Sequence, residues 1–163
     1  EVESFQTHCI KRGLAFMQIK LGIGGIGIQI YCQEELEIRG TLKQFIEEIE
    51  EDIRIDIVKE QKIAVPELSY RGENLFCRYY GENDRLQVEV KGALGTPSSM
   101  VFCENQMRNI RYELYSQSQK EFRTLNGIIS FLPMLQILQT YDAFLFHSSR
   151  IEMDGKAILF TGP

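Results

Sequence analysis

Short stretches in which apolar and polar residues alternate, separated by turn-forming residues, recur along the first 115 residues and constrain the fold most. Residues 53–58 place isoleucine at every second position, and residues 86–91 alternate apolar with polar side chains. A period of two is the pattern of a β-strand with one face buried and one face in solvent. The pattern predicts Leu86, Val88 and Val90 facing inward, with Gln87, Glu89 and Lys91 facing outward.

Several such stretches are close enough in sequence to form antiparallel pairs. Turn residues or polar loops of a few residues separate the members of each pair, as in β-hairpins. The predicted pairs are residues 14–21 with 26–32, residues 75–80 with 86–91, and residues 100–103 with 110–115.

A glycine cluster between the first two strands matches the pattern Gly-x-Gly-x-x-Gly at Gly22, Gly24 and Gly27. A dinucleotide-binding loop of this pattern needs a helix that begins at the third glycine, so that its amides face the pyrophosphate. Here the strand-like residues 28–32 follow instead, and the other protein-kinase motifs are missing from the sequence. The cluster is therefore interpreted as a flexible hairpin or bulge.

Residues 41–51 have the pattern of a short amphipathic helix. Thr41 and Gln44 have the spacing of a capping box, and an apolar stripe follows at helical spacing. The acidic residues 47–52 would cover the opposite side. Paired carboxylates can act as acid and base or bind a hard cation, but a near-continuous acidic run on a short helix is more often a solvated face.

A second helical and strongly apolar segment spans residues 121–141, and its main stripe consists of Leu125, Ile128, Ile129, Leu132, Leu135 and Leu138. Pro133 interrupts this segment. Proline in a helix interior costs roughly 3 kcal/mol, so the sequence predicts a kink or a second helix with Pro133 in its first turn.

Composition limits the classes of partner. The 163 residues are 44% hydrophobic, which is enough for one globular domain with a core. The net charge of -5 argues against a nucleic-acid partner and against an anionic membrane surface, because both favour clustered Lys and Arg. No apolar run is long enough for a membrane span, and the expectation is a cytoplasmic protein. The four cysteines, Cys9, Cys32, Cys77 and Cys103, lack metal-ligand spacing and are expected to be buried thiols, so no metal ligands are assigned.

The last twenty residues predict a β-hairpin. Asp154-Gly155 is a typical type I′ turn pair, and the apolar run 157–160 after it is typical of a strand buried on both faces. That strand runs into Thr161-Gly162-Pro163. A strand that leads into glycine is the entry to the phosphate-binding loop Gly-x4-Gly-Lys-Ser/Thr, of which only the first glycine, Gly162, would be present.

Residues 145–149, Leu-Phe-His-Ser-Ser, together with residues 154–163, Asp-Gly-Lys-Ala-Ile-Leu-Phe-Thr-Gly-Pro, resemble the entry to the kinase core of the HPr kinase and phosphoenolpyruvate carboxykinase-like proteins. The spacing from His147 to Gly162 is also similar to that between the family's active-site histidine and first loop glycine. The resemblance covers roughly an eighth of the chain. The loop lysine, the magnesium-binding hydroxyl and the downstream acids have no counterparts in this sequence.

The resemblance implies the amino-terminal part of an ATP-dependent phosphotransferase that phosphorylates a serine or similar hydroxyl, inactive as this chain alone. ATP and Mg²⁺ are the implied cofactors, held mostly by residues after Pro163. His147 is the implied catalytic residue, and Gly162 is the implied cofactor-binding residue. The implied partner is a protein, peptide or small-molecule phosphoacceptor, and a homo-oligomer is an open possibility.

The alternative hypothesis is a non-catalytic recognition or interaction domain, which binds a peptide or a sister subunit through a free sheet edge. The predicted fold class is α+β, because strands come first and the apolar helical segment follows. It comprises an antiparallel meander, one short acidic helix, a buried apolar helical segment and a C-terminal hairpin that opens a P-loop kinase core. The predicted regions are a β-rich region 1–118 and a helical and hairpin region 119–163.

Overall fold

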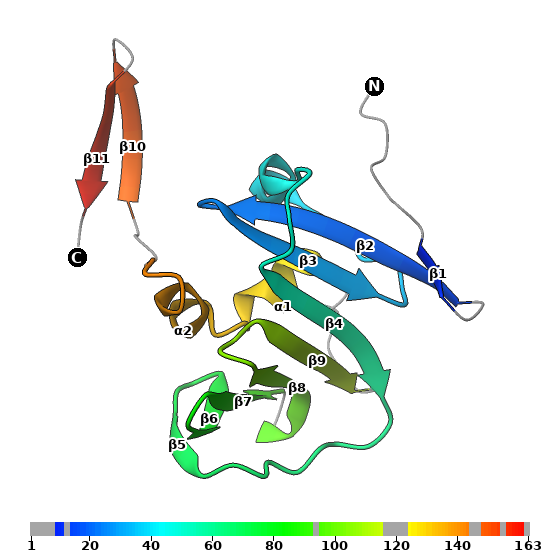
Figure 1. The fold of residues 1–163 in the computed structure, drawn as a ribbon. Coiled ribbons are helices and arrows are strands. Elements are labelled where there is room, and N and C mark those ends of the chain that lie inside the picture. Colours follow the sequence, from blue (N-terminus) through cyan, green and yellow to red (C-terminus); the bar gives the residue numbers. More distant parts are fainter. Residues whose placement is uncertain are drawn as a thin grey trace. The chain divides into compact units, whose positions relative to one another are not determined.

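The structure is a computed structural model that describes residues 9–11, 14–92, 95–115, 124–143, 148–153 and 156–161. The chain divides into two compact units, Glu1–Pro133 and Met134–Pro163. The first unit holds a nine-stranded sheet in the order β1-β2-β3-β4-β9-β8-β7-β6-β5 (Figure 1). Its strands are β1 (Cys9–Lys11), β2 (Leu14–Ile23), β3 (Ile26–Cys32), β4 (Ile53–Glu60), β5 (Tyr70–Glu73), β6 (Cys77–Glu82), β7 (Arg85–Lys91), β8 (Pro97–Glu104) and β9 (Asn109–Tyr115).

The mixed α+β class and the three predicted strand pairs are confirmed, but the sheet is not a simple antiparallel meander. Strands β5 to β9 do form consecutive antiparallel pairs. Strand β4, however, lies parallel to both β3 and β9. After β3 the chain returns across the sheet before it enters β4, and after β4 it crosses to the far edge at β5. These two long connections make the centre of the sheet parallel.

One face of the sheet forms the core of the first unit, as the period-two pattern of β4 predicts. Ile53, Ile55 and Ile57 are each at most 3% exposed. We call this the apolar face; across the sheet it is formed by Ile28, Ile30, Ile53, Ile55, Ile57, Ile110, Tyr112, Val101, Val88 and Cys77. Cys32, Cys77 and Cys103 are buried free thiols, and desolvation raises the pKa of Cys103 to about 12.

The opposite, polar face carries most of the charged side chains of the central strands. Its ladder partners include Tyr31 with Asp56, Asp56 with Arg111, and Arg111 with Phe102. We define the polar face by Gln29, Tyr31, Arg54, Asp56, Asn109, Arg111, Glu113, Phe102, Glu104, Gln87, Glu89, Arg78 and Tyr80.

The glycine cluster forms the β2–β3 hairpin, so the hairpin interpretation is confirmed. Gly24 and Gly25 occupy its turn with φ of 61° and 83°, the left-handed region that glycine adopts without strain. Gly22 and Gly27 lie opposite each other in the ladder and serve another purpose. A Cβ atom at Gly22 would overlap the Glu47 carboxylate, and one at Gly27 would overlap the Glu50 carbonyl oxygen. These glycines therefore leave room for a crossing segment of the chain.

That crossing segment is residues 46–52, and it replaces most of the predicted acidic helix. Only the 3-10 helix η1 (Gly40–Phe45) forms, and no side chain caps it. The Glu47 N–H donates to the Lys20 oxygen at 3.3 Å and the Asp52 N–H to the Gly27 oxygen at 2.9 Å. Figure 1 shows this part of the chain passing in front of β2 and β3. The prediction was wrong because hairpin contacts outweigh a weak helical preference.

The acidic side chains of this crossing segment are exposed, and Glu48, Glu51 and Asp52 also contact the β2–β3 hairpin. Glu48 pairs with Lys20, and the Tyr31 hydroxyl donates to Glu51 at 3.0 Å. The Asp52 carboxylate accepts the Gly27 N–H at 2.8 Å. The run 47–52 therefore attaches the crossing segment to the β2–β3 hairpin.

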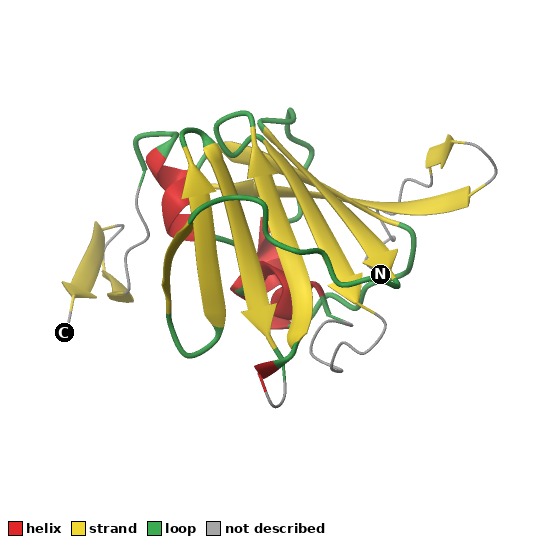
Figure 2. Cartoon of the chain, turned by 90° about the horizontal axis from the view of Figure 1, so that it is seen from below, coloured by secondary structure: helices red, strands yellow, loops and turns green. Residues whose placement is uncertain are grey.

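A second crossing segment, residues 61–69, covers the other half of the polar face. The Ala64 N–H donates to the Tyr115 hydroxyl, and the Glu67 and Leu68 N–H groups donate to Gln87 Oε1. In Figure 2 a loop runs across the strands. The prediction that Gln87 and Glu89 face solvent was wrong, because they are only 3% and 5% exposed on the covered side.

The apolar helical segment is interrupted at Pro133, as predicted. Helix α1 (Leu125–Ser130) precedes the proline, and helix α2 (Met134–Gln139) follows it. Leu125 and Ile128 are buried, whereas Leu135 of the predicted stripe is 53% exposed. The Leu125 N–H donates to the Glu37 oxygen, which attaches α1 to the first unit. None of the described helices is long and apolar enough to cross a membrane.

The second unit contains α2 and the predicted terminal hairpin. Strands β10 (Ser148–Met153) and β11 (Lys156–Thr161) pair antiparallel, with Met153 opposite Lys156. The hairpin prediction is confirmed in its pairing, while its turn, Asp154-Gly155, lies outside the described residues. Helix α1, which the sequence grouped with this region, belongs to the first unit.

Candidate functional site

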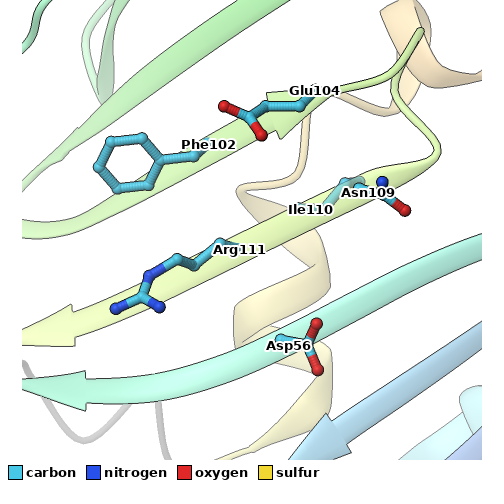
Figure 3. A pocket seen from close by; sticks show the side chains of 6 residues that line it. All are labelled: Asp56, Phe102, Glu104, Asn109, Ile110 and Arg111. Carbon is cyan, nitrogen blue, oxygen red and sulfur yellow. The ribbon is translucent and has the colours of Figure 1, made fainter.

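A pocket of about 200 Å³ opens on the polar face, over β4, β9 and β8. Figure 3 shows its lining side chains on three neighbouring strands, β4, β9 and β8, with α1 passing behind the sheet. The lining residues are Asp56, Phe102, Glu104, Asn109, Ile110 and Arg111.

The strand registers bring these residues together. Asp56 lies beside Arg111, Arg111 lies beside Phe102, and Glu104 lies beside Asn109. Directly opposed residues on one sheet face have Cβ atoms roughly 4.5–5.5 Å apart. The pocket therefore depends on the parallel pairing of β4 with β9, which puts an aspartate of one sequence region beside an arginine 55 positions later.

Arg111 is fixed along one side of the pocket by two carboxylates. Its Nη2 atom lies 2.6 Å from Glu60 Oε1, and its Nε atom donates to Glu113 Oε1 at 2.8 Å. Glu113 lies two residues further along β9, so this pairing directs the guanidinium away from Asn109. In Figure 3 the Arg111 side chain points along the strand in that direction.

On the other side of the pocket, Arg54 forms a bidentate ion pair with Asp56. Its Nε and Nη2 atoms donate to the two Asp56 oxygens, each at 2.8 Å, and its guanidinium carbon lies 4.0 Å from the Tyr31 ring centroid. The hydrogen bonds to Asp56 raise the pKa of the Arg54 guanidinium. The pKa of the Tyr31 hydroxyl is also raised, first by burial and then by its hydrogen bond to Glu51. Arg54 therefore stays cationic and leans toward β3, and this fixes the Asp56 carboxylate.

The lining favours binding over covalent chemistry. Two carboxylates, one guanidinium, one amide, one aromatic ring and one isoleucine are present, and none of the six lining residues is a histidine, cysteine, serine, threonine or lysine. Nucleophilic catalysis uses such side chains, together with a base within hydrogen-bond reach. Across the described residues, no group of three or more His, Cys, Asp and Glu side chains is arranged to hold a metal ion. The arrangement can hold a ligand by charge and by packing on Phe102.

The predicted site residues are in another part of the chain. His147 and Gly162 both lie outside the described residues, so their predicted roles remain predictions. The ATP and Mg²⁺ site that the resemblance implies likewise remains a prediction. The pocket residues were missed by motif reasoning, although the alternation along 53–58 put Asp56 on the face of its strand opposite the isoleucines.

Comparisons of the chain with protein-family models, with curated proteins and with solved structures gave no match. The function is therefore argued from the geometry of the polar face and from the local resemblance of the C-terminal residues.

Proposed function

We propose that the first unit is a recognition module that binds an extended protein segment on its polar face. The observation that carries this proposal is the pocket on the polar face, in which Asp56 is fixed by Arg54 and Arg111 is fixed by Glu60 and Glu113. Side chains fixed before binding lose less conformational entropy when a ligand arrives. Few but well-placed polar groups around an apolar surface are typical of binding sites.

A free sheet edge, the binding mode expected from sequence, fits the structure less well. Strand β5 is only four residues long, and its pairing with β6 shifts register between Tyr70 and Gly72. Within that shift, Arg71 Nε donates to the Gly81 oxygen at 2.8 Å. Short strands and bulges are devices that disfavour pairing with another chain. The polar face is therefore the better candidate surface.

Selection of random dodecapeptides on the immobilised chain tests this proposal. We expect enriched peptides, titrated into nitrogen-15-labelled protein, to shift amide resonances of residues 54–58, 100–104 and 109–113. Phe102→Ala is expected to weaken binding about 5- to 30-fold, the effect of a central aromatic contact. The matched control is Phe76→Ala, at a 59% exposed position on the β5–β6 turn, which should leave affinity unchanged.

Two results would overturn the recognition proposal. One is the absence of any peptide that binds the polar face. The other is the reverse dependence, in which Phe76→Ala abolishes binding and Phe102→Ala does not. The reverse dependence would assign recognition to the exposed apolar residues Tyr70, Leu75 and Phe76 instead.

A second candidate function concerns the second unit: it leads into an HPr kinase-like, ATP-dependent phosphotransferase core. The observation that favours it is the pairing of β10 with β11 across two residues, after which β11 ends one position before Gly162. This is the strand order that the resemblance implies before a phosphate loop. Phosphoryl transfer depends on an amide cradle, a lysine and Mg²⁺ ligands, so such chemistry requires residues after Pro163.

The native coding sequence after Pro163 tests the kinase proposal directly. We expect Ser-Gly-x-Gly-Lys-Ser/Thr to follow, and any other continuation would exclude this core. In the longer protein, ATP-dependent phosphorylation should fall when His147 is replaced by alanine. Full retention of phosphorylation in His147→Ala would remove His147 from the site.

A further inference from the structure

We infer that the pocket lined by Asp56, Phe102, Glu104 and Asn109 takes one basic side chain, an arginine or lysine, from an extended peptide. This inference rests on the proposed recognition function and specifies the chemistry of its ligand. It is carried by three observations: where the two arginines point, what remains to line the pocket, and how large the pocket is.

Both arginines near the pocket are already engaged by carboxylates. Arg111 is held by Glu60 and Glu113, and Arg54 is held by Asp56 and the Tyr31 ring. Asp56 is itself held by Arg54, so Glu104 is the lining carboxylate that is paired least closely, and the Asn109 amide lies beside it. Glu104 is 60% exposed and only 3.6 Å from an exposed Arg85, a pair of little energetic value. The loosely paired charge at the pocket is therefore the Glu104 carboxylate.

Phe102 gives the pocket an apolar surface beside these carboxylates. In Figure 3 its ring and the Glu104 carboxylate both project from β8 on the same side as Asp56. A long basic side chain has the matching chemistry, since its methylene stem packs on apolar surface while its head pairs with carboxylates. A guanidinium also stacks on an aromatic ring.

The size of the pocket limits the ligand. Sites for small molecules and cofactors typically enclose roughly 300–1,000 Å³, and this pocket of about 200 Å³ is smaller. It suits a single side chain better than a nucleotide. The net charge of -5 of the whole chain would further favour encounter with a basic segment.

Three probes test the inference: a blocked pentapeptide with a central arginine between alanines, the same peptide with citrulline, and ethylguanidinium. Citrulline keeps the shape of arginine and removes its charge. We expect the arginine peptide to shift the amide resonances of residues 102–104 and 109–111, and the citrulline peptide to bind about 2- to 10-fold more weakly. High salt should remove the difference between the two peptides.

A matched pair of protein variants tests whether the basic side chain of the peptide contacts Glu104. Glu104→Gln is expected to lower the affinity for the arginine peptide roughly 1.5- to 5-fold, the effect of losing a partly exposed ion pair. Glu37→Gln removes the same charge at a similarly exposed position, 58% against 60%, outside the pocket. This control should bind the arginine peptide as the wild type does. Both substitutions are at exposed carboxylates, so both variants are expected to fold.

The possible failures are distinguishable. Equal affinity for the arginine and citrulline peptides, or equal losses in the two variants, would overturn the inference. Ethylguanidinium binding as tightly as the arginine peptide would overturn the assignment to a peptide side chain. If selected dodecapeptides bind the polar face without any basic residue, the inference fails while the recognition function stands. If no peptide binds there at all, the recognition function itself fails.

Discussion

Replacing Gly27 with alanine is expected to lower the free energy of unfolding by about 2–3 kcal/mol, the scale of overpacking against structure that cannot move aside. The added methyl group would overlap the Glu50 carbonyl oxygen, which belongs to the backbone of the first crossing segment. That segment is held on Gly27 by the Asp52 N–H and by the Asp52 carboxylate. Relief of the overlap therefore requires both of these hydrogen bonds to shift.

Gly22→Ala is the matched control, because Gly22 is the ladder partner of Gly27. Its added methyl group would overlap only the Glu47 side chain, which is exposed and can rotate away. We expect a change within about 0.5–1 kcal/mol at this position. Urea denaturation followed by circular dichroism measures both variants, and an unchanged m-value shows that the comparison is of stability alone. Equal losses at the two glycines would contradict the crossing of residues 46–52 over the hairpin.

The second large effect is expected at the centre of the sheet. Ile55→Ala should lower the free energy of unfolding by about 2–5 kcal/mol, because it removes buried methyl groups and leaves a cavity. Ile55 is 1% exposed on β4, between Ile30 of β3 and Ile110 of β9. Rigid strands on both sides limit the collapse of the space that the side chain leaves.

The same substitution at Ile63 serves as its control. Ile63 lies on the second crossing segment and is 49% exposed, so Ile63→Ala is expected to change stability by no more than about 0.5–1 kcal/mol. Urea midpoints for the two variants give the comparison. A loss at Ile55 as small as that at Ile63 would contradict the central position of β4.

Local sequence patterns were sufficient to predict the strands and the hairpins. Alternation along residues 53–58 correctly predicts which side of β4 is buried, because side-chain direction in a strand depends only on its period. The glycine cluster predicts a hairpin for a similarly local reason, and Pro133 predicts the break between α1 and α2. None of these predictions requires knowledge of distant contacts.

The failures share one physical origin. Residues 46–52 have a helical apolar spacing, yet their backbone groups bond to Lys20 and Gly27 instead. The alternation of residues 86–91 predicts that Glu89 faces solvent. Residues 61–69, which donate a hydrogen bond to Gln87, cover that side of the sheet instead, and the Glu89 carboxylate pairs with Arg78 at 2.8 Å. In both cases contacts with a segment distant in sequence decide the outcome: they replace the weakly predicted helix, and they bury one face of the correctly predicted strand.

The candidate site shows the same division. By itself the sequence determined that Asp56 would lie on the face of its strand opposite the isoleucines, since that follows from the period of two. Only the tertiary structure decided that β4 and β9 are parallel neighbours, that two crossing segments cover other parts of the same face, and that carboxylates hold both Arg54 and Arg111. Strand order and the path of long connections depend on burial and hydrogen bonding summed over the whole unit, and no local pattern encodes that sum.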